Sequence, residues 1–399
     1  MRKVFVFIML GMLGNVQAQI TALDTVVISA QQIDQKAYET GRSVDVISAK
    51  QIAEMPVQSI DELLRYVSGV NINSRNGFGV QADLGMRGST FTQVLVLVDN
   101  VRLNDPLTGH FNHNFPVALS DIAQIEIVKG PAAVSYGADA VGGMIHIKTK
   151  SYVQDNNKEE IDATIDFGYG DHSLINTDAG IYFSKDKLTL SGSYRLLDSD
   201  GETLRNPNFD AGIAESETYD NFFSLSTASF SAAYRFSDKL RAHARFSNDQ
   251  RDFKAQYFYT ASAFDESREE TSNNWGTLAI ISEREKGNSE LNLGYRVSTD
   301  FFEFNPLFTP NEHEMTQQFA NFKNSFELGQ RSTFVLGLQY VNKEVESTDR
   351  GNHENTSLAA YGILTHSFDN GLFANASLRA ENDDNFGTEV LPQVSLSYI

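Results

Sequence analysis

From Glu159 to the end of the sequence, the chain consists of segments in which apolar and polar residues alternate. In Leu188–Arg195, leucine, glycine and tyrosine alternate with threonine, serine and arginine, and Leu240–Ser247 and Phe334–Val341 repeat the pattern. A period of two is typical of β-strands that turn one face to an apolar environment. With segments of roughly ten to sixteen residues and aromatic residues near their ends, the pattern indicates an antiparallel transmembrane β-barrel, apolar outside and polar inside.

The connections between these segments also alternate in length. Short turns are predicted at residues 184–187, 236–239, 285–288, 328–331 and 369–371, and mostly longer loops near residues 198–220, 251–273, 300–312 and 346–355. Outer-membrane barrels place short turns on the periplasmic side and long loops outside the cell. The alternation continues through roughly twelve strands, over residues 155–399.

The sequence ends inside a strand-like run, Leu391–Ile399. An open half-barrel would leave a long unpaired edge and unsatisfied backbone groups in lipid. We therefore expect the chain to be the N-terminal fragment of a longer protein. The alternative is a self-contained barrel of about twelve strands, for which the N-terminal domain would be too large.

Residues 1–18 are predicted to be a secretory signal peptide. Arg2 and Lys3 form a charged start, Val4–Leu13 an apolar run, and Val16–Ala18 a small-residue cleavage pattern. No other segment approaches the ~18 apolar residues of a membrane helix. The formal net charge of −20 argues against nucleic-acid binding, which needs a basic surface. The absence of cysteine excludes a disulfide scaffold.

Before the alternating segments, the chain mixes helix and strand signals, which predicts a compact α+β domain. Ser48 with Gln51, and Ser59 with Glu62, have the spacing of capping boxes, so each pair predicts the start of a short helix. Asp99–Asn100 separates two apolar, β-prone runs and predicts a two-residue hairpin turn.

The segment Asp121–Lys150 is densely punctuated by glycine. It reads as a strand, a tight turn at Gly130–Pro131, one turn of small residues, a glycine pair and a second strand. Glycines supply backbone shapes or close approaches that a Cβ would forbid. The segment lacks the Gly-Lys-Ser/Thr ending of a phosphate-binding loop. The residues that carry its pattern are Ile125, Glu126, Ile127, Lys129, Gly130, Pro131, Tyr136, Gly137, Ala140, Gly142, Gly143, Ile145, Ile147 and Thr149.

This pattern resembles the end of the plug domain of TonB-dependent outer-membrane receptors, and Asp83–Thr90 and Val94–Pro106 resemble further plug motifs. The resemblance implies an α+β plug over residues 43–150, followed by about the first half of a barrel of roughly 22 strands. It also implies the outer membrane of a Gram-negative bacterium, with the plug facing the barrel lumen. The stretch Asn100–Ile147 looks most like the cobalamin-receptor branch, although many siderophore and haem receptors share most of it.

Residues 24–30, within the N-terminal segment 19–42, resemble the TonB box that these receptors offer to the energy-coupling protein TonB. The β-branched Val26, Val27 and Ile28 favour an extended strand, and strand addition would pair its backbone with the partner. The alternative is that the run is simply the first plug strand. The residues expected to contact TonB are Asp24, Thr25, Val26, Val27 and Ile28.

Two plug loops, residues 74–79 and 108–114, are the first candidates for ligand contact. Their donors, acceptors and rings suit the polar rim of a corrinoid or a siderophore, and a histidine could approach a metal centre. The alternative is hydrated loops packed against the barrel wall. No carboxylate at a matching spacing supports a protein metal site at the two histidines. The candidate ligand contacts are Arg75, Asn76, Phe78, His110, Phe111, Asn112 and His113.

In relatives, basic residues at the motif positions of Arg87 and Lys129 pair with barrel glutamates and hold the plug in place. The resemblance implies the same role here, although Lys129 cannot form the bidentate pair of the more usual arginine. The alternative is two solvated cations. The resemblance also gives structural roles in the plug to Gly130, Pro131, Tyr136, Gly137, Gly142 and Gly143.

An acidic run follows Leu197 and contains Asp198, Asp200, Glu202 and Asp210. Clustered carboxylates with a glycine can bind Ca²⁺ through hard oxygen ligands, and some cobalamin receptors order their outer loops with calcium. The run does not match an EF-hand, and the alternative is a solvated loop. No other cofactor is expected.

Together these features predict TonB-dependent active import of a scarce, bulky ligand such as cobalamin, a ferric siderophore or haem. TonB and outer-membrane lipid are the expected partners. The chain carries no nucleotide-binding motif, so the energy would come from TonB. The alternatives are a passive porin or adhesin barrel, and an outer-membrane enzyme. We predict no enzyme, because Gly-x-Ser-x-Gly and His-Glu-x-x-His are absent from the barrel segments.

Overall fold

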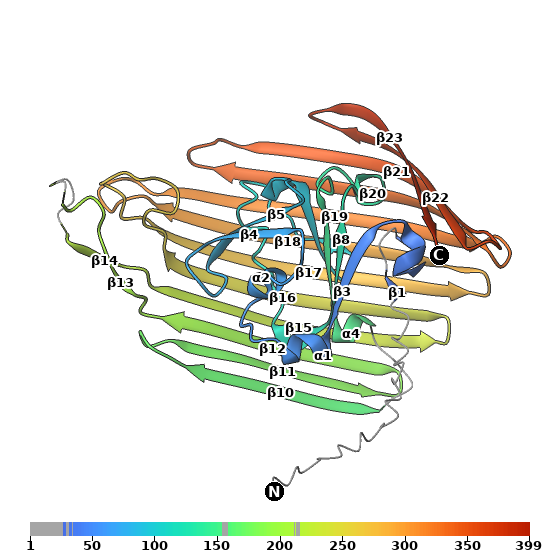
Figure 1. Ribbon diagram of the computed structural model, residues 1–399, viewed down its shortest axis with the longest axis horizontal. Helices are drawn as coiled ribbons and strands as arrows, with labels where there is room; N and C mark the ends of the chain where they lie inside the picture. Colours follow the sequence, from blue (N-terminus) through green and yellow to red (C-terminus); the bar gives the residue numbers. More distant parts are fainter. Residues whose placement is uncertain (1–26, 29–31, 34, 154–158, 211, 213–215) are drawn as a thin grey trace, which may run out of the picture.

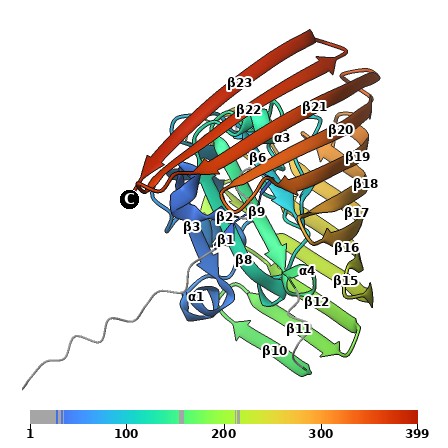
Figure 2. The ribbon, with the colours of Figure 1, turned by 90° about the vertical axis from the view of Figure 1, so that its right-hand side faces the viewer.

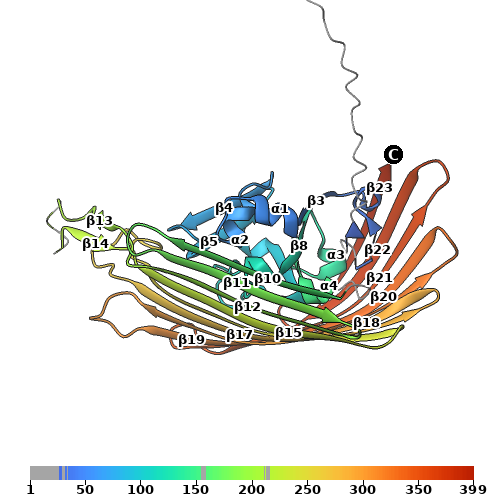
Figure 3. The ribbon, with the colours of Figure 1, turned by 90° about the horizontal axis from the view of Figure 1, so that it is seen from below.

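The computed structural model describes residues 27–28, 32–33, 35–153, 159–210, 212 and 216–399. In this part of the chain, a small mixed domain, the plug, lies against the concave face of one large curved sheet (Figures 1 and 3). The order of an α+β domain followed by an antiparallel sheet is as predicted. The predicted signal peptide and residues 24–26 and 29–30 of the predicted TonB box lie outside the described residues.

The large sheet has twelve strands in sequential order, each antiparallel to the next, which confirms the predicted number. Figure 2 shows how the sheet curves around the plug from β10 to β23. The strands are β10 (Glu160–Tyr169), β11 (Ile175–Lys185), β12 (Leu188–Ser199), β15 (Phe223–Ser237), β16 (Leu240–Lys254), β17 (Arg268–Arg284), β18 (Gly287–Glu303), β19 (Asn311–Glu327), β20 (Ser332–Ser347), β21 (His353–Ser367), β22 (Leu372–Asp383) and β23 (Gly387–Tyr398). In the loop after β12, β13 (Thr203–Arg205) and β14 (Thr218–Asp220) form a separate short hairpin.

Side chains alternate between the two faces of this sheet, because successive strand residues point in opposite directions. On β16, His243 and Arg245 are buried on the concave face, whereas Phe246 is 56% exposed on the outer face. On β20, Gln339 is buried and the neighbouring Leu338 is 61% exposed. The predicted pattern of apolar residues outside and polar residues inside is therefore confirmed.

All five predicted short turns are confirmed, and they lie at one end of the sheet, here called the turn side. They join β11 to β12, β15 to β16, β17 to β18, β19 to β20, and β21 to β22. The longer connections lie at the opposite end, here called the loop side. In outer-membrane barrels the turn side is periplasmic and the loop side is extracellular.

The strands extend further on the loop side than the sequence analysis predicts. The predicted loop at 251–273 is reduced to residues 255–267, because β16 continues to Lys254 and β17 begins at Arg268. Arg268 donates two hydrogen bonds to Asp252 on β16, at 2.8 and 2.7 Å. Charged residues that suggested a loop instead form a cross-strand pair, which stabilises the extension of the sheet.

The plug contains a five-stranded sheet in the order β3-β8-β9-β6-β7 with short helices around it. None of the described helices is long and apolar enough to cross a membrane. The strands are β1 (Val27–Ile28), β2 (Gln35–Lys36), β3 (Ser43–Ser48), β4 (Val70–Arg75), β5 (Gln81–Met86), β6 (Val94–Val98), β7 (Val101–Arg102), β8 (Ile122–Lys129) and β9 (Gly143–Thr149). The helices are α1 (Ala49–Glu54), α2 (Ile60–Leu64), α3 (Ala133–Tyr136) and α4 (Lys150–Val153), with 3₁₀ turns η1 (Ala37–Thr40), η2 (Phe91–Gln93) and η3 (Leu119–Asp121).

Both predicted helix starts are present. The Ser48 side chain accepts from the Gln51 backbone, and the Gln51 side chain accepts from Ser48 N at 2.9 Å, so the first capping box is complete. Ser59 caps α2 by accepting from the Glu62 backbone at 3.4 Å. The Glu62 carboxylate accepts from Gln58 N at 2.8 Å, one residue earlier than a capping box requires.

The predicted hairpin at Asp99–Asn100 is confirmed, since these two residues join β6 to β7. Both have positive φ, 48° and 66°, as a type I′ turn requires. The Asp99 carboxylate accepts from the backbone and the hydroxyl of Thr149, at 2.9 and 2.8 Å. The turn is thereby fixed to the end of β9.

The plug and the large sheet share one hydrophobic core. Trp275, Phe319 and Val341 of the large sheet belong to the same buried cluster as Ile125 and Ile127 of β8. Removal of this apolar surface from water favours the docked position of the plug.

A charged cluster is also buried in the plug sheet. Glu126 is 0% exposed, and its Oε1 lies 2.5 Å from Lys148 Nζ and accepts from Gln124 Nε2 at 2.7 Å. His146 Nδ1 lies 3.6 Å from Glu126 Oε2, while His146 Nε2 accepts from Asn100 N at 3.1 Å. Burial would raise the pKa of Glu126, but His146 and Lys148 lower it to about 2. Burial lowers the pKa of His146.

Candidate functional site

Two predicted ligand contacts meet at the loop side of the plug. Arg75 Nη1 lies 3.0 Å from Asp83 Oδ2, and His110 Nδ1 lies 2.6 Å from Asp83 Oδ1. The imidazole stacks on Phe91 at 4.4 Å, and the guanidinium lies 5.5 Å from the centre of the exposed Tyr259 ring. Burial would raise the pKa of Asp83, but the hydrogen bond from His110 and the charges of His110 and Arg75 lower it below its ordinary value. This group offers donors and aromatic faces to a molecule arriving from the loop side.

The other two candidates in the first loop contact the wall of the large sheet. Asn76 Nδ2 donates to Asn221 O at 3.1 Å. Phe78 packs on Phe223 with ring centres 5.9 Å apart, beside a buried cluster that includes Phe253. Both residues therefore attach the plug loop to the wall, as the alternative interpretation of this loop supposed.

The remaining candidates in the second loop are buried. Asn112 accepts from Asp105 N at 2.6 Å and donates to Phe91 O at 2.9 Å, and Phe111 is buried beside it. Burial and the charge of Arg251 lower the pKa of the buried His113 to about 4. The structure thus gives these three side chains a part in folding the loop and leaves His110 as its accessible member.

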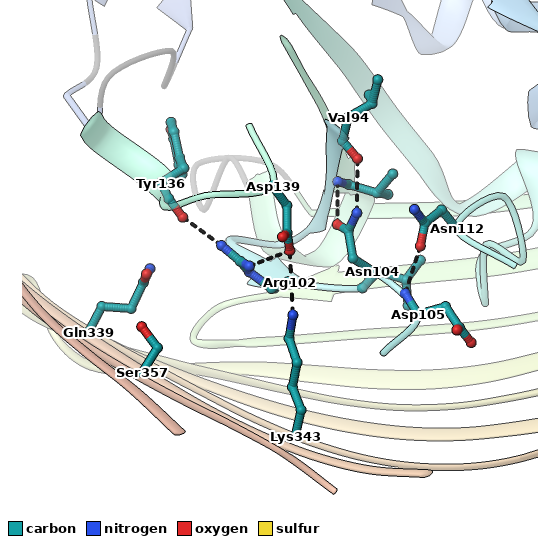
Figure 4. Close-up of polar contacts among 12 residues, drawn as sticks. Val94, Arg102, Asn104, Asp105, Asn112, Tyr136, Asp139, Gln339, Lys343 and Ser357 are labelled. Carbon is teal, nitrogen blue, oxygen red and sulfur yellow. Dashed lines mark hydrogen bonds and ion pairs between the residues drawn. The ribbon is translucent and has the colours of Figure 1, made fainter. Parts of the chain in front are cut away.

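A cavity of about 360 Å³ lies between the plug and β20–β23, toward the loop side. It was not predicted from the sequence. Arg102 of β7, Asp139 after α3, and Lys343 of β20 line it, together with the acidic Glu381 and Asp383 of β22. Figure 4 shows Arg102, Asp139 and Lys343 converging from the plug and the wall.

The three charges of this cavity hold each other in place. Arg102 Nη1 lies 2.5 Å from Asp139 Oδ2, and Lys343 Nζ lies 3.7 Å from the same oxygen. Arg102 Nη2 also donates to Tyr136 O at 2.7 Å (Figure 4). Burial would raise the pKa of Asp139, but Arg102 and then Lys343 lower it. The cavity therefore presents fixed, charged hydrogen-bonding groups of both signs.

Gly137 lies next to this group and has a φ of +98°. A Cβ on this residue would lie 2.9 Å from Arg102 Nη2 and 3.2 Å from Arg379 Nη2. Further along the motif, a Cβ on Gly143 would lie 2.2 Å from Met86 Sδ and 2.4 Å from Val128 O. Glycine at position 137 therefore lets two arginines approach the turn, and glycine at position 143 lets Met86 and the backbone of β8 approach β9.

The other motif residues lie around the same turn. Gly130 N donates to Gly142 O at 2.9 Å, and Pro131 O accepts from Arg42 Nη1 at 2.6 Å. Tyr136 is buried. These contacts close the turn that the glycine pattern indicates.

The N-terminal segment is held by a group that we call the clasp, formed by Gln32, Tyr136 and Lys323. Gln32 N donates to Tyr136 OH at 3.3 Å, and Lys323 Nζ donates to Gln32 O at 3.3 Å. Lys323 also lies 2.9 Å from Glu290 Oε2, and Glu290 Oε1 accepts from Asn100 Nδ2 at 2.7 Å. The clasp connects the N-terminal segment to the plug turn and to the wall.

Just before the clasp, the described part of the predicted TonB box, β1, pairs antiparallel with β2. The partners are Val27 with Lys36 and Ile28 with Gln35. This short ladder shows that the run adopts the extended form that its β-branched residues favour.

Arg87 and Lys129 lie side by side in the plug, where Arg87 Nη1 donates to Lys129 O at 3.4 Å. Lys129 forms an ion pair with Asp45 of β3. Within the described residues, neither forms an ion pair with a glutamate of the large sheet. Their predicted role in retaining the plug stays a prediction.

The four carboxylates of the predicted calcium site are not gathered. Asp210 forms an ion pair with Arg205 at 2.7 Å, whereas Asp198 lies within β12, and Asp200 and Glu202 follow the end of that strand. In the part of the chain that the structure describes, no group of three or more histidine, cysteine or carboxylate side chains could hold a metal ion.

Residues 36–144 match the family of the TonB-dependent receptor plug domain. The vitamin B12 transporter BtuB of Vibrio cholerae serotype O1 is 24% identical over 379 residues, which are 94% of this chain and 60% of that protein. BtuB of Vibrio vulnificus (strain YJ016) is 34% identical over 183 residues, which are 43% of this chain and 29% of that protein. The chain thus spans less than two thirds of the length of these relatives.

Solved structures share the fold at lower sequence identity. The siderophore receptor PirA from Acinetobacter baumannii has a TM-score of 0.71 at 17% identity, covering 89% of this chain and 59% of that chain. A mutant of the ferric enterobactin receptor PfeA from Pseudomonas aeruginosa has a TM-score of 0.72 at 15% identity, covering 94% of this chain and 61% of that chain.

Proposed function

The chain belongs to the TonB-dependent outer-membrane receptors, and on that premise we propose that it takes up a scarce, bulky ligand across the outer membrane. The ligand is bound and passed on without chemical change, so the chain is not an enzyme. The two relatives described above from Vibrio species are vitamin B12 transporters, so cobalamin is the first ligand we propose. Ferric siderophores and haem are the alternatives.

One observation carries this proposal: the plug lies inside the curved sheet and shares its core, while polar groups on the loop side stay accessible. A ligand arriving from outside would meet Arg75, His110 and the Tyr259 ring first. Charged hydrogen bonds and ring faces are the groups that fix a large polar ligand in a site. The cavity at Arg102 and Asp139, between plug and wall, would offer further charged groups to a ligand that moves past the plug.

We propose that TonB supplies the energy by binding residues 24–30. Strand addition needs an extended segment with a free edge. Val27 and Ile28 are extended and pair with β2 along one edge, and no other described strand pairs with them, so we propose that their other edge receives the partner strand. A passive porin or adhesin, the second candidate, would need no such segment.

Equilibrium binding of cobalamin to the full-length receptor in detergent tests the ligand. Saturable binding supports cobalamin, and the absence of binding at micromolar ligand directs the search to ferric siderophores and haem. A chelator arm tests the calcium prediction: cobalamin binding that disappears on chelation, and returns with added Ca²⁺, would support a cation at Asp198, Asp200, Glu202 and Asp210.

Uptake by cells tests the mechanism separately. Deleting residues 24–30 should abolish accumulation of labelled cobalamin and leave its binding to the cell surface unchanged. Unchanged accumulation after this deletion would favour the passive barrel.

A further inference from the structure

The outer face of the large sheet carries a hollow of about 810 Å³ across β19–β22. These four strands are adjacent and in sequence order (Figure 2). The lining on this face is almost entirely apolar, and Leu336, Leu338 and Leu378 stand exposed at its walls. The outward-facing residues that line the hollow are Phe322, Asn324, Phe326, Phe334, Leu336, Leu338, Ala360, Gly362, Leu364, Ala376, Leu378 and Ala380.

The hollow exists because small residues occupy its floor. Across the strands, Leu338 pairs with Ala360 and Ala360 with Ala380, while Gly362 lies between Leu336 and Leu378. A Cβ on Gly362 would approach Leu336 no closer than 3.7 Å, which is an ordinary contact. The packing of the strands therefore does not require glycine at position 362, and a larger side chain would fit there without a clash.

Arg284 lies at the turn-side end of this hollow. Arg284, exposed at the end of β17, donates from Nη2 to Asn324 Oδ1, to Ser325 O at 3.0 Å and to Asn288 O at 3.2 Å. Its guanidinium lies 5.4 Å from the centre of the Phe326 ring. Asn324 and Phe326 line the hollow, so the charge is fixed at its edge.

The arrangement has the chemistry of an amphiphile with an anionic head. All three hydrogen bonds use Nη2, so Nε and Nη1 remain, and each can donate one charge-assisted hydrogen bond to a phosphate oxygen. In an outer-membrane barrel, the turn side lies at the periplasmic leaflet, where phospholipid head groups are found. An acyl chain would then extend from the Arg284 guanidinium along the hollow toward Gly362 and Ala360.

We propose that this hollow binds one phospholipid of the periplasmic leaflet, with its phosphate on Arg284 and an acyl chain on the floor formed by Ala360, Gly362 and Ala376. The site depends on the outer-membrane location of the chain and not on the identity of its transported ligand. It makes β19–β22 a preferred lipid position on the barrel.

The chain offers a matched control for the head-group contact. Arg331 also lies on the turn side, beside the start of β20, but it forms an ion pair with Asp369. Its charge is already compensated, so it should add little to the binding of an anion. An exposed arginine near a membrane surface contributes about 1 kcal/mol to anionic lipid binding, which is about fivefold in affinity.

Native mass spectrometry of the full-length receptor in detergent, titrated with dioleoyl phosphatidylglycerol, tests the site. Arg284→Gln should weaken the tightest-bound lipid about fivefold, while Arg331→Gln leaves it unchanged. Ala360→Phe fills the floor and should remove that lipid, whereas Ala320→Phe, on the outer face of β19 outside the hollow, should not. Heat-modifiable gel mobility checks that each variant keeps its barrel.

Three outcomes would overturn the proposal. The first is equal lipid affinity in the folded Arg284→Gln and Arg331→Gln variants. The second is an unchanged tight lipid in folded Ala360→Phe. The third is a change of oligomeric state in Ala360→Phe without any loss of lipid, which would identify the hollow as a contact between copies of the chain. Because no transported ligand is used, none of these outcomes depends on the proposed import.

Discussion

Replacing Lys148 by methionine should destabilise the plug, because it leaves the Glu126 carboxylate buried without its closest cation. Glu126 is 0% exposed, and its pKa of about 2 lies well below its ordinary value near 4.5. That difference corresponds to about 3 kcal/mol of stabilisation at neutral pH. His146 and Lys148 share this stabilisation. Breaking a buried ion pair from one side typically costs ~3–5 kcal/mol, and we expect the lower end, about 3 kcal/mol, because His146 still faces Glu126.

Hydrogen exchange of the β8 and β9 amides in the full-length receptor measures this loss. A decrease of about 3 kcal/mol in the opening free energy would accelerate their exchange roughly a hundredfold. The double variant Glu126→Gln with Lys148→Met should recover most of the loss, since no charge then stays buried. Lys150→Met is the control: Lys150 pairs with the half-exposed Asp162 at 2.9 Å, so its loss should cost no more than ~0.5 kcal/mol.

The same cluster predicts the direction of the pH dependence. The pKa of Glu126 is lowered in the fold, so its contribution is present above about pH 4.5 and is lost as the pH falls toward about 2. Burial also lowers the pKa of His146, which adds a loss of stability as the pH falls below its ordinary value of 6.5. Exchange rates in Lys148→Met equal to those of the wild type, or a plug that becomes more protected on acidification, would refute this reasoning.

Three further predictions follow from other contacts. Gly337→Ala should lower the free energy of unfolding by about 2 kcal/mol, because its Cβ would lie 2.0 Å from the Tyr361 ring. Gly362→Ala should change it by less than ~0.5 kcal/mol, and calorimetry in detergent measures the difference. Lys323→Met should lower the unfolding temperature of the plug, because the buried Glu290 carboxylate that accepts from Asn100 of the plug then loses the cation beside it. Glu290→Gln in the same chain should restore that temperature. His110→Ala should weaken cobalamin binding about tenfold, and an unchanged Kd would remove His110 from the site.

The architecture of the sheet could be predicted because it depends on local sequence. Alternation along each strand is enough to assign the faces of β12, β16 and β20, and turn residues are enough to locate five connections. The predicted positions of the loop-side strand ends were wrong. Asp252 and Arg268 are typical loop residues when each is considered alone, and they form a cross-strand pair only because β16 and β17 are in register.

The candidate site could be predicted only in part, because burial depends on residues distant in the sequence. His110 and His113 have similar surroundings in the sequence, yet one stacks on Phe91 and the other is buried against Arg251. The ion pair of Lys129 with Asp45 was not predicted, because it depends on the register of β3 and β8, whereas the predicted pairing with a barrel glutamate stays a prediction. The cavity at Arg102 was not predicted for the same reason, since its lining comes from two domains.

The clasp at Gln32 has a mechanical consequence. A pull on the chain before Val27 would open the two rungs of the β1–β2 ladder one after the other, an unzipping that needs little force. Among the described residues, the next contact under load would be the clasp, where Gln32 binds both Tyr136 of the plug and Lys323 of the large sheet. The force would therefore be divided between the plug, through Tyr136, and the large sheet, through Lys323, before any strand of the plug sheet is pulled.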